Sequence, residues 1–182
     1  MVCVSESERI NSSPLSDDVE GDLVRSYING DDPSTILDIG CGPTLTVKGS
    51  CGLDMVEKGF CNPHVQGESV ARYQHDLNKG KMPLEDETFS IVIARHILEH
   101  CIDVVAVLKD IHRVLKIDGK VIVCLPDERI GDTISMNPEH VHAFTLSSFV
   151  NLVENIGFRA VSTREGYNGV SFTVVLEKDN GN

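Results

Sequence analysis

The sequence contains no tryptophan, and aromatic residues make up only 5% of the chain. Proteins that bind single-stranded nucleic acid stack the bases on exposed aromatic rings, so this composition disfavours such a platform. Basic residues are also scarce, with 16 Lys and Arg against 28 Asp and Glu and a net charge of −12. Because binding to a phosphate backbone depends on Lys and Arg, we expect no nucleic-acid partner.

Long apolar runs are missing as well. No stretch of about 18 consecutive apolar residues is present, so we expect no membrane span. The N-terminus, M-V-C-V-S-E-S-E-R-I, lacks the basic and apolar segments of a secretory signal. None of the six cysteines forms a Cys-x-x-Cys pair. We therefore expect reduced thiols in a cytoplasmic protein, and no bound metal ion, because zinc sites favour closely paired ligands.

A length of 182 residues corresponds to one domain. Residues 1–15 are polar and show no periodicity, which predicts a flexible N-terminal arm before a single domain over residues 16–182. Apolar residues from Val19 to Ile28 recur at helical spacing. Ser16 is a suitable N-cap for this helix, and Gly30 and Pro33 are expected to end it.

Strand-like apolar runs then alternate with turns and helices, which is typical of an α/β fold with a doubly wound sheet. The runs F-S-I-V-I-A and K-V-I-V-C-L are almost continuously apolar, as parallel strands buried on both faces usually are. Between them, Asp103 is expected to cap a helix that Asp118 and Gly119 end, and a second helix is expected over 145–155. The predicted strands comprise residues 35–39, 51–54, 72–76, 89–94, 120–125, 158–164 and 170–177, the last two as an antiparallel hairpin.

The most informative segment is I-L-D-I-G-C-G-P-T, which begins at Ile36. Gly40 and Gly42 let the backbone approach a ligand that a Cβ atom would block. Asp38 stands at the carboxyl end of the first strand, where open α/β sheets bind ligands. Its carboxylate would repel a pyrophosphate and attract a cationic amino group, and Leu45 occupies the third glycine position of the dinucleotide fingerprint. A glycine turn that merely connects a strand to a helix is the alternative.

Two further acids end predicted strands. Asp54, in C-G-L-D-M, can accept hydrogen bonds from both hydroxyls of a ribose, and Asp76, in Y-Q-H-D-L, can accept one from an adenine amino group. The carboxyl ends of successive parallel strands lie at one edge of the sheet. We therefore expect these acids to face one site together with Asp38.

These segments resemble the Rossmann-like S-adenosylmethionine-dependent methyltransferases, in particular the small methyltransferase type-11 group. The resemblance covers about Thr35 to Phe158 and extends through H-I-L-E-H, L-K-D-I-H-R-V-L-K and H-A-F-T-L-S-S-F. It implies a three-layer, mostly parallel seven-stranded sheet with a C-terminal antiparallel hairpin, and S-adenosyl-L-methionine as cofactor. Because only 15 residues separate Asp38 from Asp54, the first crossover helix is expected to shrink to a loop. The cofactor contacts that the resemblance implies are Asp38, Gly40, Cys41, Gly42, Asp54, Met55, Asp76, Leu77, Ala94, Arg95 and His96.

The H-x-x-E-H pattern at residues 96–100 also occurs in the inverzincin metallopeptidases. On a helix, His96 and His100 would face one metal ion with Glu99 as the base, and Glu177 is a conceivable third ligand. The flanking context of such an enzyme is missing, so we favour a short helix with apolar residues packed inward and His96 near the cofactor. A catalytically silent module that binds the cofactor or a partner on the same fold is the other alternative.

Residues 126–144 form a connection long enough to act as a lid over the same edge of the sheet. The connection contains His140 and His142, candidate general bases for an acceptor that loses a proton during in-line methyl transfer. Either histidine suits a structural contact at the start of the next helix equally well. We expect a small-molecule acceptor, because no N-P-P-Y-type motif is present and a separate substrate domain does not fit. The methylated atom and the oligomeric state stay open.

Overall fold

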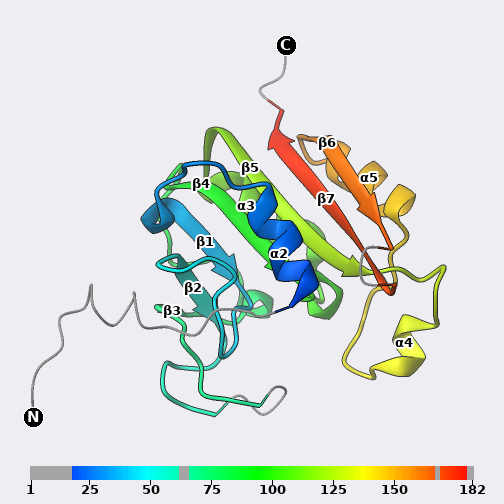
Figure 1. The fold of residues 1–182 in the computed structure, drawn as a ribbon, viewed down its shortest axis with the longest axis horizontal. Helices are drawn as coiled ribbons and strands as arrows, with labels where there is room; N and C mark the ends of the chain where they lie inside the picture. Colours follow the sequence, from blue (N-terminus) through cyan, green and yellow to red (C-terminus); the bar gives the residue numbers. More distant parts are fainter. Residues whose placement is uncertain (1–17, 62–65, 167–168, 180–182) are drawn as a thin grey trace, which may run out of the picture.

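The computed structural model describes residues 18–61, 66–166 and 169–179, so the predicted arm over residues 1–15 lies outside the described residues. Seven strands form one sheet in the order β3-β2-β1-β4-β5-β7-β6 (Figure 1). The strands are β1 Ile36–Ile39, β2 Cys51–Asp54, β3 Tyr73–Gln74, β4 Phe89–Arg95, β5 Leu115–Pro126, β6 Phe158–Glu165 and β7 Ser171–Lys178.

The sheet is parallel from β3 to β5, and β7 pairs antiparallel with both β5 and β6. This confirms the expected mostly parallel sheet with an antiparallel C-terminal hairpin. The carboxyl ends of the parallel strands consequently meet at one edge of the sheet. No helix lies between β1 and β2, which confirms that the first crossover is reduced to a loop.

Helices cover both faces of the sheet and give three layers (Figure 1). Val24 of the N-terminal helix packs with Ile36, Ile91 and Ile93 on one face. The opposite face packs against the two longer helices, over residues 104–114 and 146–154, and it forms the larger core cluster. The helices are α2 Val19–Ser26, α3 Val104–Val114, α4 Thr133–Met136 and α5 Leu146–Glu154, with short 3₁₀ turns η1 Pro33–Thr35, η2 Leu77–Lys79 and η3 Leu98–His100.

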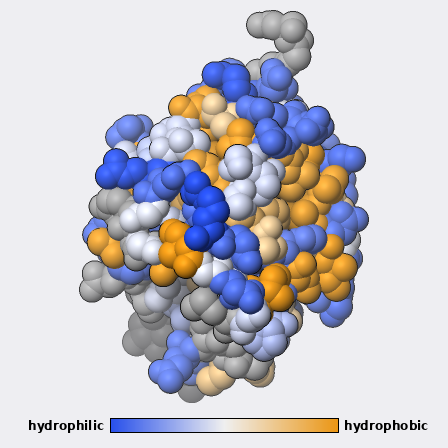
Figure 2. Space-filling view, turned by 90° about the vertical axis from the view of Figure 1, so that its right-hand side faces the viewer, coloured by the Kyte–Doolittle hydropathy of each residue, from blue (hydrophilic) through white to orange (hydrophobic). Residues whose placement is uncertain are grey.

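Strand β6 forms one edge of the sheet, and most of its residues are exposed or half-buried. The side of the molecule that carries β6 and α4 mixes apolar and polar surface (Figure 2). Ile134 on α4 and Val161 on β6 are exposed apolar residues. The ion pair between Arg159 and Glu177 places charge along the edge, which opposes pairing with a further strand.

Several predicted boundaries differ from the structure. Asp18, rather than Ser16, caps α2, because its Oδ1 accepts a hydrogen bond from the Gly21 amide at 2.6 Å. The predicted third strand shrinks to two residues. Helix α3 ends at Val114, four residues before the expected Asp118–Gly119 stop, and those two residues lie within β5.

The early end of α3 has a physical reason in strand pairing. Leu115 pairs with Phe89, and the next pair joins Lys120 to Ile91, so β5 carries an irregularity between them. Asp118 adopts a positive φ of 62° in this irregularity. The Asp-Gly pair does form a turn, but the turn makes a kink within a strand and does not end a helix.

In the part of the chain that the structure describes, no helix is long and apolar enough to cross a membrane.

Candidate active site

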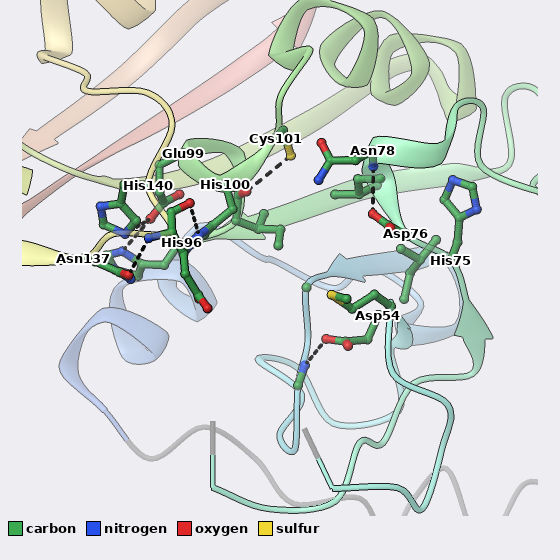
Figure 3. A pocket seen from close by; sticks show the side chains of 17 residues that line it. Asp54, His75, Asp76, Asn78, His96, Glu99, His100, Cys101, Asn137 and His140 are labelled. Atoms are coloured by element: carbon green, nitrogen blue, oxygen red, sulfur yellow. Dashed lines mark hydrogen bonds and ion pairs between the residues drawn. The ribbon is translucent and has the colours of Figure 1, made fainter. Parts of the chain in front are cut away.

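A cavity of about 550 Å³ opens where β1 and β2 end (Figure 3). Its volume lies within the range of about 300–1,000 Å³ that is usual for small-molecule sites. Asp54, Asp76, His75 and Asn78 lie toward one end of the cavity, and imidazole groups gather at the other end (Figure 3). Seven of the residues that sequence reasoning assigned to the cofactor line it: Gly40, Gly42, Asp54, Met55, Asp76, Leu77 and His96.

The glycine loop after β1 forms one wall. Gly40 and Gly42 have positive φ angles of 68° and 55°, a region that favours glycine. A Cβ atom on Gly40 would lie only 2.7 Å from Cγ1 of Ile97, in the segment after β4. The loop is therefore closely packed against that segment, and a side chain at this position would displace it.

Asp54 is buried at the end of β2 and is held by two backbone amides. Its Oδ2 accepts a hydrogen bond from Gly42 at 2.9 Å, and its Oδ1 accepts one from Val56 at 2.9 Å. Each carboxylate oxygen has two acceptor positions, so each can accept one more hydrogen bond from a ligand. The arrangement fixes a carboxylate against the glycine loop and directs it to the cavity.

Asp76 lies beyond the end of β3 and caps η2. Its Oδ1 accepts a hydrogen bond from the Asn78 amide at 3.0 Å, and Lys79 Nζ lies 3.5 Å from Oδ2. Asn78 in turn accepts a hydrogen bond from the Ile102 amide at 2.7 Å through its side-chain oxygen. These contacts join the β3 end of the cavity to the segment after η3.

A second cavity of about 400 Å³ shares Gly40, Gly42 and His96 with the first. Asp38, Cys41 and Arg95 line this second cavity and not the first, whereas Ala94 is fully buried and lines neither. Asp38 Oδ2 accepts a hydrogen bond from the Thr46 amide at 2.6 Å, and burial raises the pKa of its carboxyl group to about 6. Apart from Ala94, the predicted cofactor residues are thus divided between two adjoining cavities.

His96 follows the last buried residues of β4 with a positive φ of 49°. Its Nε2 lies 3.0 Å from Glu20 Oε2, and its Nδ1 lies 3.5 Å from Glu99 Oε1. Burial alone would lower the pKa of His96, but the two carboxylates outweigh burial and raise it to about 9. The imidazolium therefore connects α2 to η3 across the site.

Glu20 is a buried acid of α2 that sequence reasoning did not assign to the site. Burial alone would raise its pKa, but the hydrogen bonds and charges of its partners lower the pKa to about 2. Besides His96, these partners are Ser171, which donates a 2.6 Å hydrogen bond, and Arg95, whose Nη2 lies 3.3 Å from Oε2. The contact spans 76 residues of sequence to His96, so no local pattern could have indicated it.

The H-x-x-E-H segment does not form the α-helix that the metallopeptidase alternative requires. Residues 98–100 make a 3₁₀ turn, and His96 lies before it at the end of β4 with Glu20 as its partner. Glu177 pairs with Arg159 on the neighbouring strand. A metal ion shared by His96, His100 and Glu177 is therefore inconsistent with this geometry.

The structure separates the two candidate bases of the 126–144 connection. His140 lines the first cavity, and its Nδ1 lies 3.0 Å from the carbonyl oxygen of Thr133. His142 does not line it: its ring lies against Phe144, and its Nε2 is 3.4 Å from the Ile102 carbonyl. The amides of Val141 and His142 both donate to the Glu99 carbonyl, at 2.9 and 3.2 Å.

Sequence reasoning missed several groups at the imidazole end of the cavity. Glu99 and His100 were considered only as metallopeptidase residues, and Asn137 and Glu139 were not singled out, although all four line the cavity. The signal for Asn137 and Glu139 was weak: both belong to the segment N-P-E-H, in which His140 alone was chosen.

Comparisons with known proteins agree with this arrangement. A family model described as a methyltransferase domain matches residues 21–163, most of the chain. A search of curated proteins finds no match.

Several solved structures share the fold. An S-adenosylmethionine-dependent methyltransferase from Mesorhizobium loti has a TM-score of 0.68 at 15% identity, over 89% of this chain and 99% of that chain. The 1,6-didemethyltoxoflavin-N1-methyltransferase of Burkholderia thailandensis, with its substrate and S-adenosylhomocysteine bound, has a TM-score of 0.63 at 14% identity, over 96% and 80%. The [4+2]-cyclase SpnF has a TM-score of 0.64 at 13% identity, over 93% and 88%. Identities this low establish the fold alone.

Proposed function

The chain belongs to a family of methyltransferase domains, and from this premise we propose that it transfers a methyl group from S-adenosyl-L-methionine to a small-molecule acceptor. One observation carries the proposal. Asp54 is buried beside the glycine loop and opens on a cavity of about 550 Å³ whose same end holds Asp76. Carboxylates at the ends of adjacent parallel strands suit the hydroxyl and amino groups of an adenosyl moiety.

The end of the cavity near β2 and β3 has carboxylates and a glycine loop that suit the adenosyl part of S-adenosylmethionine. We assign the ribose to Asp54, the adenine to the neighbourhood of Asp76 and Leu77, and the close backbone approach to Gly40 and Gly42. Met55 lies half-exposed at the same wall and offers apolar contact to the base. When bound, S-adenosylmethionine supplies a methyl group on a sulfonium ion, which an aligned nucleophile displaces in line.

The second cavity offers the charges that the amino-acid end of the cofactor requires. Asp38 suits an ammonium group, and Arg95 suits a carboxylate; both line this cavity beside Gly40 and Gly42. A cation next to Asp38 favours the charged form of a carboxyl group whose pKa burial raises to about 6. Arg95 already pairs with Asp18 at 2.7 Å, so its guanidinium is held in place before any ligand arrives.

The opposite end of the first cavity is assigned to the acceptor. Asn137 and His140 reach it from the 126–144 connection, and His100 reaches it from η3. For an acceptor that must lose a proton, His140 is placed to accept it, whereas His142 stands outside the cavity. A neutral amine or a carboxylate acceptor needs no base.

We also propose a cytoplasmic location, with which the five described cysteines, all free thiols, are consistent.

A turnover assay distinguishes a methyltransferase from a catalytically silent module with the same fold. It also distinguishes methyl transfer from other reactions on this fold, such as that of the structural neighbour SpnF. The purified protein is incubated with methyl-labelled S-adenosylmethionine and a small-molecule library, and S-adenosylhomocysteine release is measured. We expect acceptor-dependent release. Binding of the cofactor without release for any acceptor would favour the silent module.

The cofactor assignment is tested with Asp54→Ala. Loss of hydrogen bonds to a charged group removes about 1.5–3 kcal/mol, so affinity for S-adenosylmethionine should fall about 10- to 150-fold. Calorimetric titration measures the affinity, and Asp103→Ala, at the start of α3 and outside both cavities, is the control. Equal affinities of Asp54→Ala and the wild type would remove Asp54 from the site.

A further inference from the structure

A carboxylate and two imidazoles converge at the acceptor end of the first cavity. One ligand atom from each of Glu99, His100 and His140 lies within 4.8 Å of the others. The rings of His100 and His140 meet edge to face, with centroids 4.7 Å apart (Figure 3). Sequence reasoning expected no metal because the candidate ligands are not closely paired along the chain. The fold brings these residues together, because the amides of Val141 and His142 in the 126–144 connection donate hydrogen bonds to the Glu99 carbonyl.

Glu99 is the unusual member of the cluster. Its side chain is 1% exposed, and within the described part of the chain neither carboxylate oxygen has a hydrogen-bond partner. His140 Nε2 lies 3.9 Å from Oε1, and His96 Nδ1 lies 3.5 Å away, an ion-pair contact longer than a well-formed hydrogen bond. A buried carboxylate without hydrogen bonds is costly and indicates a missing partner.

The hydrogen bonds of the two histidines determine what that partner is. His140 Nδ1 faces the Thr133 carbonyl at 3.0 Å, and His100 Nδ1 faces the Glu139 carbonyl at 3.1 Å. A carbonyl only accepts, so each ring has a proton on Nδ1, and in the neutral form of each ring the lone pair is on Nε2. In a neutral His140, that lone pair is directed at the carboxylate of Glu99, which is repulsive unless a cation lies between them. Ring N–H groups held by backbone carbonyls are also the usual second contact of metal-ligating histidines.

We propose that Glu99, His100 and His140 bind a divalent transition-metal ion, with zinc preferred, and leave one coordination position open to the cavity. Two imidazoles, one carboxylate and an open position are a ligand set of catalytic zinc sites. The inference goes beyond the proposed function, because metal binding is measured without cofactor or acceptor. An ion on His140 Nε2 occupies the lone pair that a base requires. In the metal-loaded protein, an acceptor hydroxyl would then be activated by coordination, which lowers its pKa.

Titration with zinc tests the site directly. Protein prepared without a histidine tag is treated with a chelator, exchanged into chelator-free buffer and titrated with zinc chloride in a calorimeter. We expect one equivalent to bind, and magnesium to bind far more weakly because it prefers oxygen ligands. Glu99→Gln, His100→Asn and His140→Asn should each weaken zinc binding by about 100-fold or more, since even residues that only support ligands contribute about 10- to 100-fold.

His142→Asn is the matched control, because His142 lies two residues from His140 and outside the cluster. It should bind zinc as the wild type does. Circular dichroism and thermal unfolding of each variant show that it is folded, and the wild type is also titrated with S-adenosylmethionine. Wild-type protein that binds the cofactor but no zinc would overturn the metal site and leave the proposed function intact. Zinc bound equally by all three ligand variants would overturn it as well.

Cobalt substitution decides the ligand type even if a variant fails to fold. Cobalt(II) bound to wild-type protein should show visible absorption bands of nitrogen and oxygen ligands. Cys101 lines the same cavity, but its Sγ donates to the Ile97 carbonyl at 3.3 Å and is not part of the cluster. A thiolate-to-cobalt charge-transfer band, or no cobalt spectrum at all, would overturn the proposed ligand set.

Discussion

Glu20 is the buried residue through which the N-terminal helix contacts the active-site edge, next to the ion pair of Asp18 with Arg95. Its carboxylate is 5% exposed and meets the cations of Arg95 and His96 and the hydroxyl of Ser171. A buried charge with several partners stabilises a structure only while all of them are present, because removal of one leaves the others unpaired. The same carboxylate also maintains the charge of His96, which borders both cavities.

Replacement of this carboxylate should change the titration of His96. In Glu20→Gln we expect the pKa of His96 to fall from about 9 toward its ordinary 6.5, because a neutral amide no longer stabilises the imidazolium. Proton NMR of the imidazole resonances measures the shift, with Glu154→Gln on the exposed face of α5 as control. An unchanged pKa of His96 would show that Glu20 does not govern it.

The pH dependence of stability follows from the same two groups. The raised pKa of His96 gives stability that is complete below its ordinary 6.5 and is lost as pH rises through about 9. The lowered pKa of Glu20 gives stability that is present above its ordinary 4.5 and is lost as pH falls through about 2. The difference in unfolding free energy between wild type and Glu20→Gln should therefore be largest between pH 4.5 and 6.5 in urea titrations.

Among the elements, the 126–144 connection is the one predicted to act as a lid. Its two ends are joined by a bridge between Asp127 and Phe144, and α4 lies between them. Helix α4 has only four residues, which is too short to be stable by itself. The connection therefore consists of a part near Val141, held by two backbone hydrogen bonds to Glu99, and a part around α4 in which Ile134 is exposed.

Amide exchange should distinguish these two parts. We expect slow exchange at Val141 and His142, whose amides donate to Glu99, and fast exchange at Ile134 and Ser135 within α4. Addition of S-adenosylhomocysteine and an acceptor should slow exchange in α4, because the same connection supplies Asn137 and His140 to the cavity. Hydrogen exchange followed by mass spectrometry measures both. Slow exchange throughout the connection without ligand would assign it to the rigid scaffold.

Element prediction succeeded where the signal was local. Helix α5 begins within one residue of its expected start at Thr145, because the cap that Thr145 forms needs only the amide of Ser148 three residues away. Strand β4 and the second half of β5 follow directly from the continuous apolar runs F-S-I-V-I-A and K-V-I-V-C-L. The end of α3 was wrong because Leu115 is recruited by Phe89 of β4, a pairing that local propensity does not contain.

At the scale of the molecule, parallel topology explains why half of the site was predictable. Acids at the ends of β1, β2 and β3 must approach one edge, and Asp54 and Asp76 both line the cavity at that edge. The position of Asp38 in a second cavity could not be predicted from the sequence. It depends on the path of the loop after β1, which brings the Thr46 amide to the Asp38 carboxylate. The approach of His140 to Glu99 could not be predicted either, since the contact requires the complete path of the chain from η3 to α5.

The two faces of the sheet are covered by different helices, α2 on one face and α3 with α5 on the other. Val24 of α2 is fully buried against Ile36 and Ile93, while Val153 of α5 is fully buried in the larger cluster on the other face. Val24→Ala and Val153→Ala remove the same groups, so each should lower the unfolding free energy by about 1.5–3 kcal/mol in urea titrations.

Only the α2 variant should also affect the cofactor. Helix α2 carries Glu20 to Arg95 and His96, so a loosened α2 disturbs residues that border the second cavity. Val24→Ala should therefore weaken S-adenosylmethionine binding by about 2- to 30-fold, the effect of a coupling of about 0.5–2 kcal/mol. Val153→Ala, with the same loss of packing, should bind it as the wild type does, in calorimetric titrations well below both unfolding midpoints. Equal losses of affinity in the two variants would mean that cofactor binding follows global stability, and that α2 has no specific part in the site.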